Sequence, residues 1–272
     1  MMCVNYSTSA DFTSQFKENL EKSQLFSKIL CLEQTGSTND DVRTLLTQTG
    51  KSPVCVLAQL QTSGRGTHGR VWSNMMGSIL LSVGGYLQRP VQEYAGVTLA
   101  VGAYIVRALR TIGCGVYLKW PNDIWFSSGK AGGILTEIVS CGEGRAIVVG
   151  VGVNITVPQQ ITAPKGCVAT GIGVPIGKSR ADIATVIAIS AMQAVNDFNR
   201  AVLVDISDDW SQLDAFYGKT VIVMDEAHIP LYQAISCGLT QQGALMVRRE
   251  DGEVVHLISG SVRLVPEGTE VV

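Results

Sequence analysis

The segment Val54–Ser82 reads VCVLAQLQTSGRGTHGRVWSNMMGSILLS, in which two apolar runs flank a glycine-rich stretch. Glycines at 64, 66 and 69 fit the G-x-G-x-x-G pattern of dinucleotide binding. That pattern requires the glycines to lead directly into a helix, whose amino terminus meets the pyrophosphate. Here they lead into a second run of strand composition. The segment therefore favours two strands joined by a loop over a Rossmann fold.

The sequence on either side of this segment predicts helices. Residues 11–30 are typical of a polar helix, and STNDDVRTLLTQTG is typical of a second helix capped by Ser37 or Thr38. Residues 94–113 keep apolar side chains at helical spacing and end on a glycine, which is a common helix stop. A fourth helical pattern covers residues 179–202.

Three runs rich in Val, Ile and Leu predict a sheet: GVYLKW, GGILTEIVS and RAIVVGVGVNI. They are separated by the turn-forming stretches PNDIWFSSGK and CGEG, and short turns between consecutive strands indicate antiparallel pairing. From about Gly218, short strands at turn-punctuated spacing predict a small β-barrel domain. We therefore expect an α+β fold, with a mixed or antiparallel sheet, flanking helices and a small carboxyl-terminal barrel.

Composition excludes several classes of function. The 272 residues carry a net charge of -2, which gives no electrostatic reason to expect nucleic-acid binding. Seven cysteines, odd in number and without C-x-x-C spacing, argue against a disulfide framework or a zinc site. The first residues lack a secretory signal, and the apolar stretch 95–106 is too short to span a bilayer. We expect a soluble, cytoplasmic protein with no membrane partner.

Two constellations of residues are candidates for ligand binding. The glycine loop brings Arg65, His68 and Arg70 beside Trp72, which suits an anionic or adenylated ligand. Lys119 ends an apolar strand and is followed by a rigid Trp-Pro-Asn-Asp turn, so its ammonium group has a defined place. The alternatives are a solvated surface turn for the loop and an ordinary edge-strand lysine.

Five segments taken together are more specific. In order, GSTND, QTSGRGTHGRVW, KWPNDIW, GGILTE and GVGVNI resemble the biotin protein ligases, also called biotin-[acetyl-CoA-carboxylase] ligases or holocarboxylase synthetases. The resemblance runs from about residue 30 to the carboxyl end. It implies an amino-terminal extension over 1–29, a catalytic domain like that of class II aminoacyl-tRNA synthetases over 30–215, and an SH3-like β-barrel over 216–272. Some bacterial members carry an amino-terminal DNA-binding domain; here only about 30 residues precede the core and show no basic helix pair, so we expect no such domain.

The resemblance implies an ATP-dependent reaction in two steps. Biotin and MgATP would form biotinyl-5'-adenylate, and biotin would then pass to a lysine in the biotin-carrier domain of a carboxylase. The mixed anhydride is itself the activated species, so no nucleophilic side chain is needed. Mg²⁺ is expected to arrive on ATP rather than in a metal site of the protein. Strands near the glycine loop could also pair across a homodimer.

The resemblance also implies roles for individual residues. Lys119 and Arg65 would be catalytic, because cations offset the repulsion between the biotin carboxylate and the α-phosphate. Biotin contacts are expected from Ser37, Thr38, Asn39, Gln61, Gly64, Arg65, Gly66, Thr67, Lys119, Gly132, Gly133 and Ile134. ATP or adenylate contacts are expected from Arg65, Arg70, Trp72, Lys119, Asn122 and Asn154.

Purely structural roles are the alternatives for several of these residues. Ser37 or Thr38 can serve only as a helix cap, and glycines at 132 and 133 can mark a bulge. Trp72 can be a core side chain, and Asn154 can be a buried turn residue.

The glycine loop departs from the family pattern at two positions. The family loop often reads Gly-Arg-Gly-Arg-Arg-Gly-Arg, whereas Thr67 and His68 stand here in place of the middle basic pair. This removes one fixed positive charge near the adenylate and makes another pH-dependent.

Two other functions are alternatives to biotin ligation. A lipoate-protein ligase or octanoyltransferase is one, and a non-catalytic biotin-binding module is the other. The sequence leaves open which carboxylases accept biotin.

Overall fold

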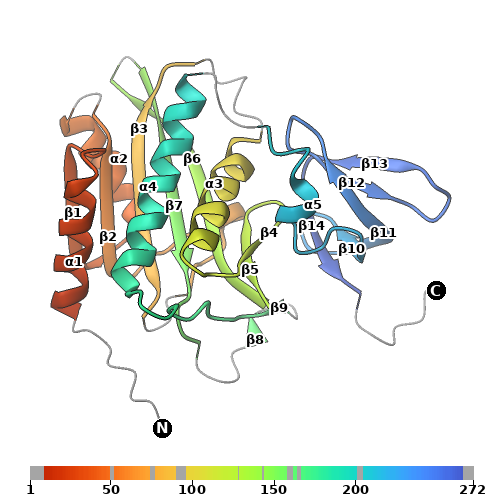
Figure 1. Cartoon of the computed structure of the whole chain (residues 1–272). Coiled ribbons are helices and arrows are strands. Elements are labelled where there is room, and N and C mark those ends of the chain that lie inside the picture. The colour runs from red at the N-terminus through yellow and green to blue at the C-terminus, as the bar shows by residue number, and fades with distance from the viewer. Residues whose placement is uncertain are drawn as a thin grey trace, which may run out of the picture.

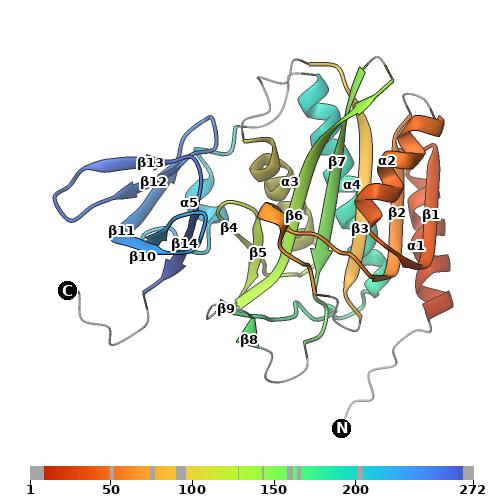
Figure 2. The ribbon, with the colours of Figure 1, turned by 180° about the vertical axis from the view of Figure 1, so that it is seen from behind.

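A computed structural model of the chain describes residues 9–49, 52–73, 77–89, 96–127, 129–142, 144–157, 162–163, 167–200 and 205–265. It contains a mixed sheet with helices on both faces and, beside it, a smaller antiparallel sheet (Figures 1 and 2). Residues 1–8 of the expected extension and 266–272 of the expected barrel lie outside the described residues. Among the described residues, no helix is long and apolar enough to cross a membrane.

The main sheet has seven strands in the order β1-β2-β3-β7-β6-β5-β4. In chain order they are β1 (Lys28–Thr35), β2 (Val54–Gln61), β3 (Ile79–Leu87), β4 (Tyr117–Lys119), β5 (Asp123–Phe126), β6 (Gly129–Cys141) and β7 (Gly144–Val153). β1 and β2 are parallel, and the other neighbours are antiparallel. A short hairpin, β8 (Thr162–Ala163) and β9 (Cys167–Val168), lies near β6. The expected mixed sheet is confirmed.

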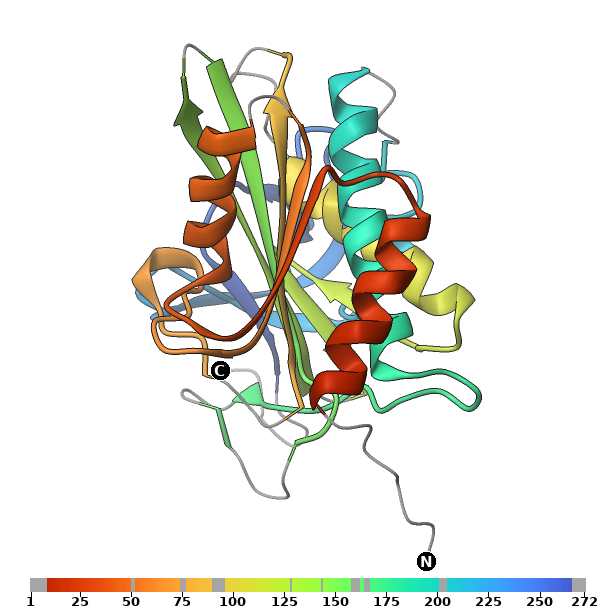
Figure 3. The same ribbon diagram turned by 90° about the vertical axis from the view of Figure 1, so that its left-hand side faces the viewer.

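Helices cover both faces of this sheet. They are α1 (Ser9–Lys22), α2 (Thr38–Thr49), α3 (Val97–Thr111) and α4 (Arg180–Asn199), whereas the short α5 (Trp210–Leu213) contacts the smaller sheet. α1, α3 and α4 lie on one face and α2 on the other (Figure 3). Successive side chains of β2 point to opposite faces of the sheet, so this one strand packs against the helices on both sides. Cys55 and Leu57 join the core under α4, whereas Val54 and Val56 pack with α2.

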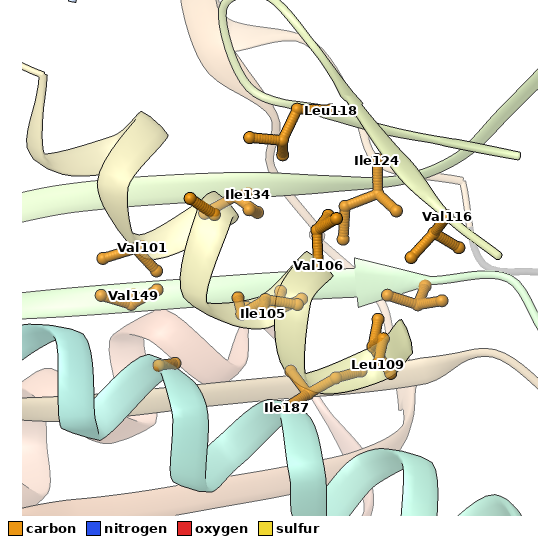
Figure 4. Packing of buried hydrophobic residues seen from close by; sticks show 14 of the residues in the cluster. Val101, Ile105, Val106, Leu109, Val116, Leu118, Ile124, Ile134, Val149 and Ile187 are labelled. Carbon is orange, nitrogen blue, oxygen red and sulfur yellow. The ribbon is translucent and has the colours of Figure 1, made fainter. Parts of the chain in front are cut away.

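Helix α3 fills the core between α4 and the strands. Val101, Ile105 and Leu109 recur at four-residue intervals, are fully buried, and lie among apolar side chains of the sheet and α4 (Figure 4). The helix stops where the sequence predicts. Gly113 has a φ of 95°, a left-handed conformation that glycine adopts readily.

The predicted helix over residues 11–30 is too long. α1 ends at Lys22, and Lys28–Thr35 forms strand β1. The strand forms because β2 offers it a parallel partner from a distant part of the chain. α1 buries Phe12, Phe16 and Leu20 in the same core as α4, so this amino-terminal helix packs as part of the main body.

The stretch PNDIWFSSGK is not turn throughout, as the sequence suggested. Asp123–Phe126 forms strand β5, between β4 and β6. Ile124 and Trp125 are buried there, with 0% and 7% exposure. The free energy gained by burying these two side chains in the sheet outweighs the preference of the surrounding residues for turns.

The carboxyl-terminal residues form a second sheet. Its strands are β10 (Thr220–Met224), β11 (Pro230–Leu239), β12 (Leu245–Arg248), β13 (Val254–Leu257) and β14 (Ser261–Leu264). They pair antiparallel in the order β13-β12-β11-β10-β14. Within the described residues β13 and β14 are edges that do not pair with each other, so the expected closed barrel is not confirmed.

The two sheets are held together near β4. The backbone N–H of Ala215 donates to the carbonyl of Leu118 at 2.8 Å, and the indole N–H of Trp120 donates to the carbonyl of Gly243 at 3.1 Å. Apolar side chains of both sheets belong to one core cluster. This packing fixes the end of β4, where Lys119 lies.

Candidate active site

A cavity of about 130 Å³ opens on the α2 face of the main sheet. Most of the expected ligand-binding residues line it: Ser37, Thr38, Asn39, Gln61, Arg65, Gly66, Thr67, Arg70, Trp72, Asn122, Gly133 and Ile134. Four expected residues, Gly64, Lys119, Gly132 and Asn154, do not. The fold thus gathers the start of α2, the glycine loop and the middle of β6 and β7 around one space.

One end of the cavity is a chain of hydrogen bonds. The backbone N–H and the hydroxyl of Thr38 donate to Gln61 Oε1 at 2.8 and 3.1 Å. The Thr38 and Ser82 hydroxyls lie 2.6 Å apart, and Ser82 donates to Asn39 Oδ1 at 2.6 Å. Asn39 Nδ2 in turn donates to Glu137 Oε2 at 2.6 Å. This end therefore holds donors and acceptors in fixed positions.

Ser82 and Glu137 were not among the expected site residues. Each lies in an apolar strand run, on β3 and β6, and Glu137 is the last residue of the GGILTE segment. The alternation of the strand puts Ser82 on the α2 face, between the apolar side chains of Leu81 and Val83. A buried serine in such a run was the available signal.

Glycines of β6 and β7 make room for side chains that cross the cavity wall. A Cβ added at Gly150 would clash with Asn39 Oδ1. A Cβ added at Gly152 would lie 2.6 Å from Trp72 Cε2, and one at Gly133 would lie 3.2 Å from Trp72 Cζ3. Gly150 and Gly152 are two residues apart and so face the same side of β7. The GVGVNI spacing reflects this requirement.

The glycine loop is tied to α2 by Arg65. Its guanidinium donates to both carboxylate oxygens of Asp40, at 2.6 and 2.8 Å, and lies 3.7 Å from Glu137. These hydrogen bonds hold the pKa of Asp40 below its ordinary value. The N–H of Gly66 donates to the carbonyl of Arg70 at 2.7 Å and closes the loop. The side chain of His68 lies outside the described atoms.

Lys119 is buried behind the cavity wall. It is 8% exposed, and its Nζ lies 5.9 Å from the ring centres of Trp125 and Phe216. Its ammonium donates to Asp123 Oδ2 at 2.9 Å. On the other oxygen of Asp123, Lys130 Nζ lies at 2.6 Å.

Asp123 carries the negative charge between these two lysines. Burial acts to raise its pKa, but the two ammonium groups outweigh burial and lower the pKa to about 2. Lys130 lines the cavity, although it was not among the expected site residues. It follows a glycine in a stretch read as a turn, where a lysine is unremarkable.

Three other expected residues have clear structural partners. Asn122 Nδ2 donates to the carbonyl of Ile134 at 2.8 Å. Asn154 is buried, where it accepts from Ser78 Oγ at 3.2 Å and donates to the carbonyl of Thr170 at 3.4 Å. Gly132 allows close strand approach, because a Cβ there would lie 2.6 Å from the carbonyl oxygen of Gly152.

The residues that line the cavity all lie within a segment that matches a known protein family. The model described as the Biotin/lipoate A/B protein ligase family matches residues 31–154. This range contains every side chain that lines the cavity. Residues 31–154 of the chain thus carry the domain of this family.

Known relatives of this ligase include biotin protein ligases. The bifunctional ligase/repressor BirA of Escherichia coli is 29% identical over 220 residues, which are 79% of this chain and 67% of that protein. A biotin–[acetyl-CoA-carboxylase] ligase of Mycobacterium tuberculosis is 34% identical over 151 residues, 52% of this chain and 54% of the other. The fold resembles the Aquifex aeolicus biotin protein ligase in complex with biotin and ATP, with a TM-score of 0.67, 22% identity, and coverage of 88% and 99%.

Proposed function

We propose that this ligase activates biotin with MgATP and transfers it to protein. In the first step, a carboxylate oxygen of biotin bonds to the α-phosphorus and pyrophosphate leaves, which gives biotinyl-5'-adenylate. In the second step, the amine of an acceptor lysine attacks the acyl carbon and AMP leaves. The proposed acceptor is the biotin-carrier domain of a biotin-dependent carboxylase. Mg²⁺ enters on the ATP phosphates and keeps several of its waters.

The observation that supports the proposal is that one cavity has a hydrogen-bonding end, at Thr38 and Asn39, and a cationic side, at Lys130. The ureido group of biotin has two N–H donors and one carbonyl acceptor. Thr38 and Asn39 line the polar end with hydroxyl and amide groups of both kinds, and the buried Ser82 is hydrogen-bonded to both of them. Lys130 lies on the cationic side. A ligand with a ureido head and an acidic tail matches both.

The proposed catalytic role of Arg65 and Lys119 is electrostatic. Arg65 holds the glycine loop at the cavity, bound to Asp40. Lys119 lies behind the wall, paired with Asp123, and its ammonium group would neutralise charge that develops on the phosphate. Removing a group that stabilises developing charge typically slows a reaction on the order of a hundredfold to a thousandfold.

The remaining expected contacts are proposed for the two parts of the adenylate. Ser37, Gln61, Gly64, Gly66, Thr67 and Ile134 would contact biotin, along with the glycines of β6. Trp72, Arg70, Asn122 and Asn154 would contact the nucleotide. Trp72 supports this assignment, because its ring covers Gly133 and Gly152 at the cavity wall.

We also propose a reducing, cytoplasmic setting. It is supported by five free cysteines, namely Cys31, Cys55, Cys114, Cys141 and Cys237. We also predict a homodimer, which sedimentation in solution tests. Closure of the carboxyl-terminal sheet into an SH3-like barrel likewise stays a prediction.

The experiment measures pyrophosphate release from MgATP with biotin and, in parallel, with lipoate. The variant is Lys119→Ala, and the control is Lys28→Ala at the exposed start of β1, on the opposite edge of the sheet. We expect release with biotin that collapses in Lys119→Ala and is retained in Lys28→Ala. Release with lipoate alone would make the protein a lipoate ligase. Release with neither acid would leave a binding module.

A further inference from the structure

Glu137 lies on β6 beside the polar end of the cavity, where it meets three donor side chains. Asn39 Nδ2 donates to its Oε2 at 2.6 Å. A guanidinium nitrogen of Arg65 lies 3.7 Å from the same oxygen, and one of Arg43 lies 3.8 Å from Oε1. Asn39 lines the cavity, so Glu137 can act on a ligand through Asn39.

Glu137 decides which way the Asn39 amide points. A carboxylate has no hydrogen to donate, so its short contact with Asn39 requires the amide nitrogen at that place. The amide oxygen then faces Ser82, whose hydroxyl donates to it at 2.6 Å. Gly150 makes room for this arrangement, because a Cβ added there would clash with Asn39 Oδ1.

The other end of the chain of hydrogen bonds is fixed in the same sense. The backbone N–H of Thr38 donates to Gln61 Oε1 at 2.8 Å, which places an amide oxygen there as well. The Thr38 hydroxyl lies 3.1 Å from this oxygen and 2.6 Å from the Ser82 hydroxyl. Two hydroxyl groups thus lie between two amide oxygens.

Both hydroxyl hydrogens are used inside this group. The Ser82 hydrogen goes to Asn39 Oδ1, and the single Thr38 hydrogen goes to Gln61 or to Ser82. Thr38 lines the cavity, so its oxygen can only accept from a ligand. If the Asn39 amide turned over, its nitrogen would face Ser82. The Ser82 hydrogen would then go to Thr38 and occupy a lone pair that the ligand needs.

We propose that Glu137 is a positioning residue for the ureido group of biotin. It orients the Asn39 amide and, through Ser82, keeps the Thr38 hydroxyl as an acceptor for a ureido N–H. The inference rests on the proposed function. In this role Glu137 touches no substrate atom and transfers no proton.

The role of Glu137 as a partner of the two arginines is separable from its role as an acceptor. Arg65 also donates to both carboxylate oxygens of Asp40, so the glycine loop stays tied to α2 without Glu137. The Arg43 side chain is 47% exposed and is hydrated. A neutral side chain that still accepts from Asn39 therefore distinguishes the two roles.

The test measures the affinity for biotin by calorimetry and the KM for MgATP by pyrophosphate release. Glu137→Gln keeps an accepting oxygen, whereas Glu137→Met has a similar length and no oxygen. Glu137→Met is also made together with Ser82→Ala, which breaks the chain between Asn39 and Thr38. The control is Glu253→Met, which removes a carboxylate that pairs with Arg249 at 2.9 Å beside the smaller sheet.

Glu137→Met should bind biotin about three- to tenfold more weakly, the net effect of one hydrogen bond, and its KM for MgATP should change less than about twofold. Glu137→Gln should stay within about twofold of the wild type, and Glu253→Met should match it. In the Ser82→Ala background, Glu137→Met should lower the affinity by less than about twofold, because the chain is already broken.

Equal losses in Glu137→Gln and Glu137→Met would assign the effect to charge and overturn the proposal. The same conclusion would follow from no loss in Glu137→Met, from an equal loss in both backgrounds, or from a rise in the KM for MgATP that matches the loss for biotin. A wild-type protein that does not bind biotin would overturn the proposed function itself. That result is distinguishable from the others because it needs no variant.

Discussion

Trp72 packs directly on Gly152, eighty positions later in the chain, and no larger residue would fit there. A Cβ added at Gly152 would lie 2.6 Å from Cε2 and 2.7 Å from Cζ2 of the indole. The cavity that Trp72 covers measures about 130 Å³. Ligand pockets usually measure about 300–1,000 Å³. The ring therefore occupies space that a nucleotide-sized ligand needs.

Gly152→Ala should displace Trp72 and weaken ligand binding. Overpacking a site by one methyl group costs about 1–3 kcal/mol, so affinity for biotinyl-5'-adenylate should fall roughly ten- to a hundredfold. Calorimetric titration measures this loss. Gly115→Ala is the matched control, because nothing lies within 4 Å of a Cβ added there. An unchanged affinity in Gly152→Ala would contradict the packing of this wall.

Ligand binding should move the Trp72 indole. Its buried Nε1 has no hydrogen-bond partner among the described residues, and such a group costs about 1–3 kcal/mol. Biotin or the adenylate should therefore change the tryptophan fluorescence on titration, and Trp72→Phe should abolish that change. The other tryptophans, Trp120, Trp125 and Trp210, are buried in the core and report on the fold. A signal that survives in Trp72→Phe would place the movement elsewhere.

The loop should retain the adenylate poorly. Thr67 lines the cavity where the related loop often has arginine, so one fixed positive charge is missing. We expect the protein to release more free biotinyl-5'-adenylate than a relative with the full basic loop, and Thr67→Arg to reduce that release. Chromatography of reactions without acceptor measures the released adenylate. Comparable release from the relative under matched conditions would count against the prediction.

Asp214→Asn should stabilise the protein at neutral pH. Burial raises the pKa of Asp214 to about 6, against hydrogen bonds from the Phe216 N–H and the Ser236 hydroxyl. The folded state thus binds more protons than the unfolded state between about pH 4 and 6, and stability falls as pH rises through this window. Asparagine removes the ionisation, and its oxygen can accept from the Phe216 N–H while its amide nitrogen donates to the Ser236 hydroxyl oxygen.

The gain for Asp214→Asn should be about 1–3 kcal/mol at pH 7.5 and should vanish near pH 4, as a pKa raised by about two units implies. Urea unfolding at the two pH values measures it. The control variant is Asp208→Asn, at an exposed position outside this hydrogen-bond group. A gain of equal size at both pH values would show that ionisation of Asp214 is not its cause.

Local sequence patterns were sufficient to predict the structure where it depends on residues that are close together along the chain. The end of α3 at Gly113 depends on a single left-handed residue, so the sequence predicts it. Residues 123–126 were misread because their strand exists only through β4 and β6 on either side. Ser82 and Lys130 were missed for the same reason, since their partners are distant in sequence or lie across a bulge.

By itself, the sequence determined the resemblance of this ligase to biotin protein ligases, the mixed sheet with its helices, and most residues that line the cavity. These follow from short motifs and from periodicities of two and 3.6 residues, which local geometry imposes. Only the tertiary structure decided which cations are neutralised and which face a ligand. Arg65 meets Asp40, Lys119 and Lys130 share Asp123, and Trp72 covers Gly152. Charge pairing and close packing depend on the distances between side chains of different strands and loops. Those distances are set by the pleat of the strands, by the bulge between β5 and β6, and by the packing of the helices on the sheet.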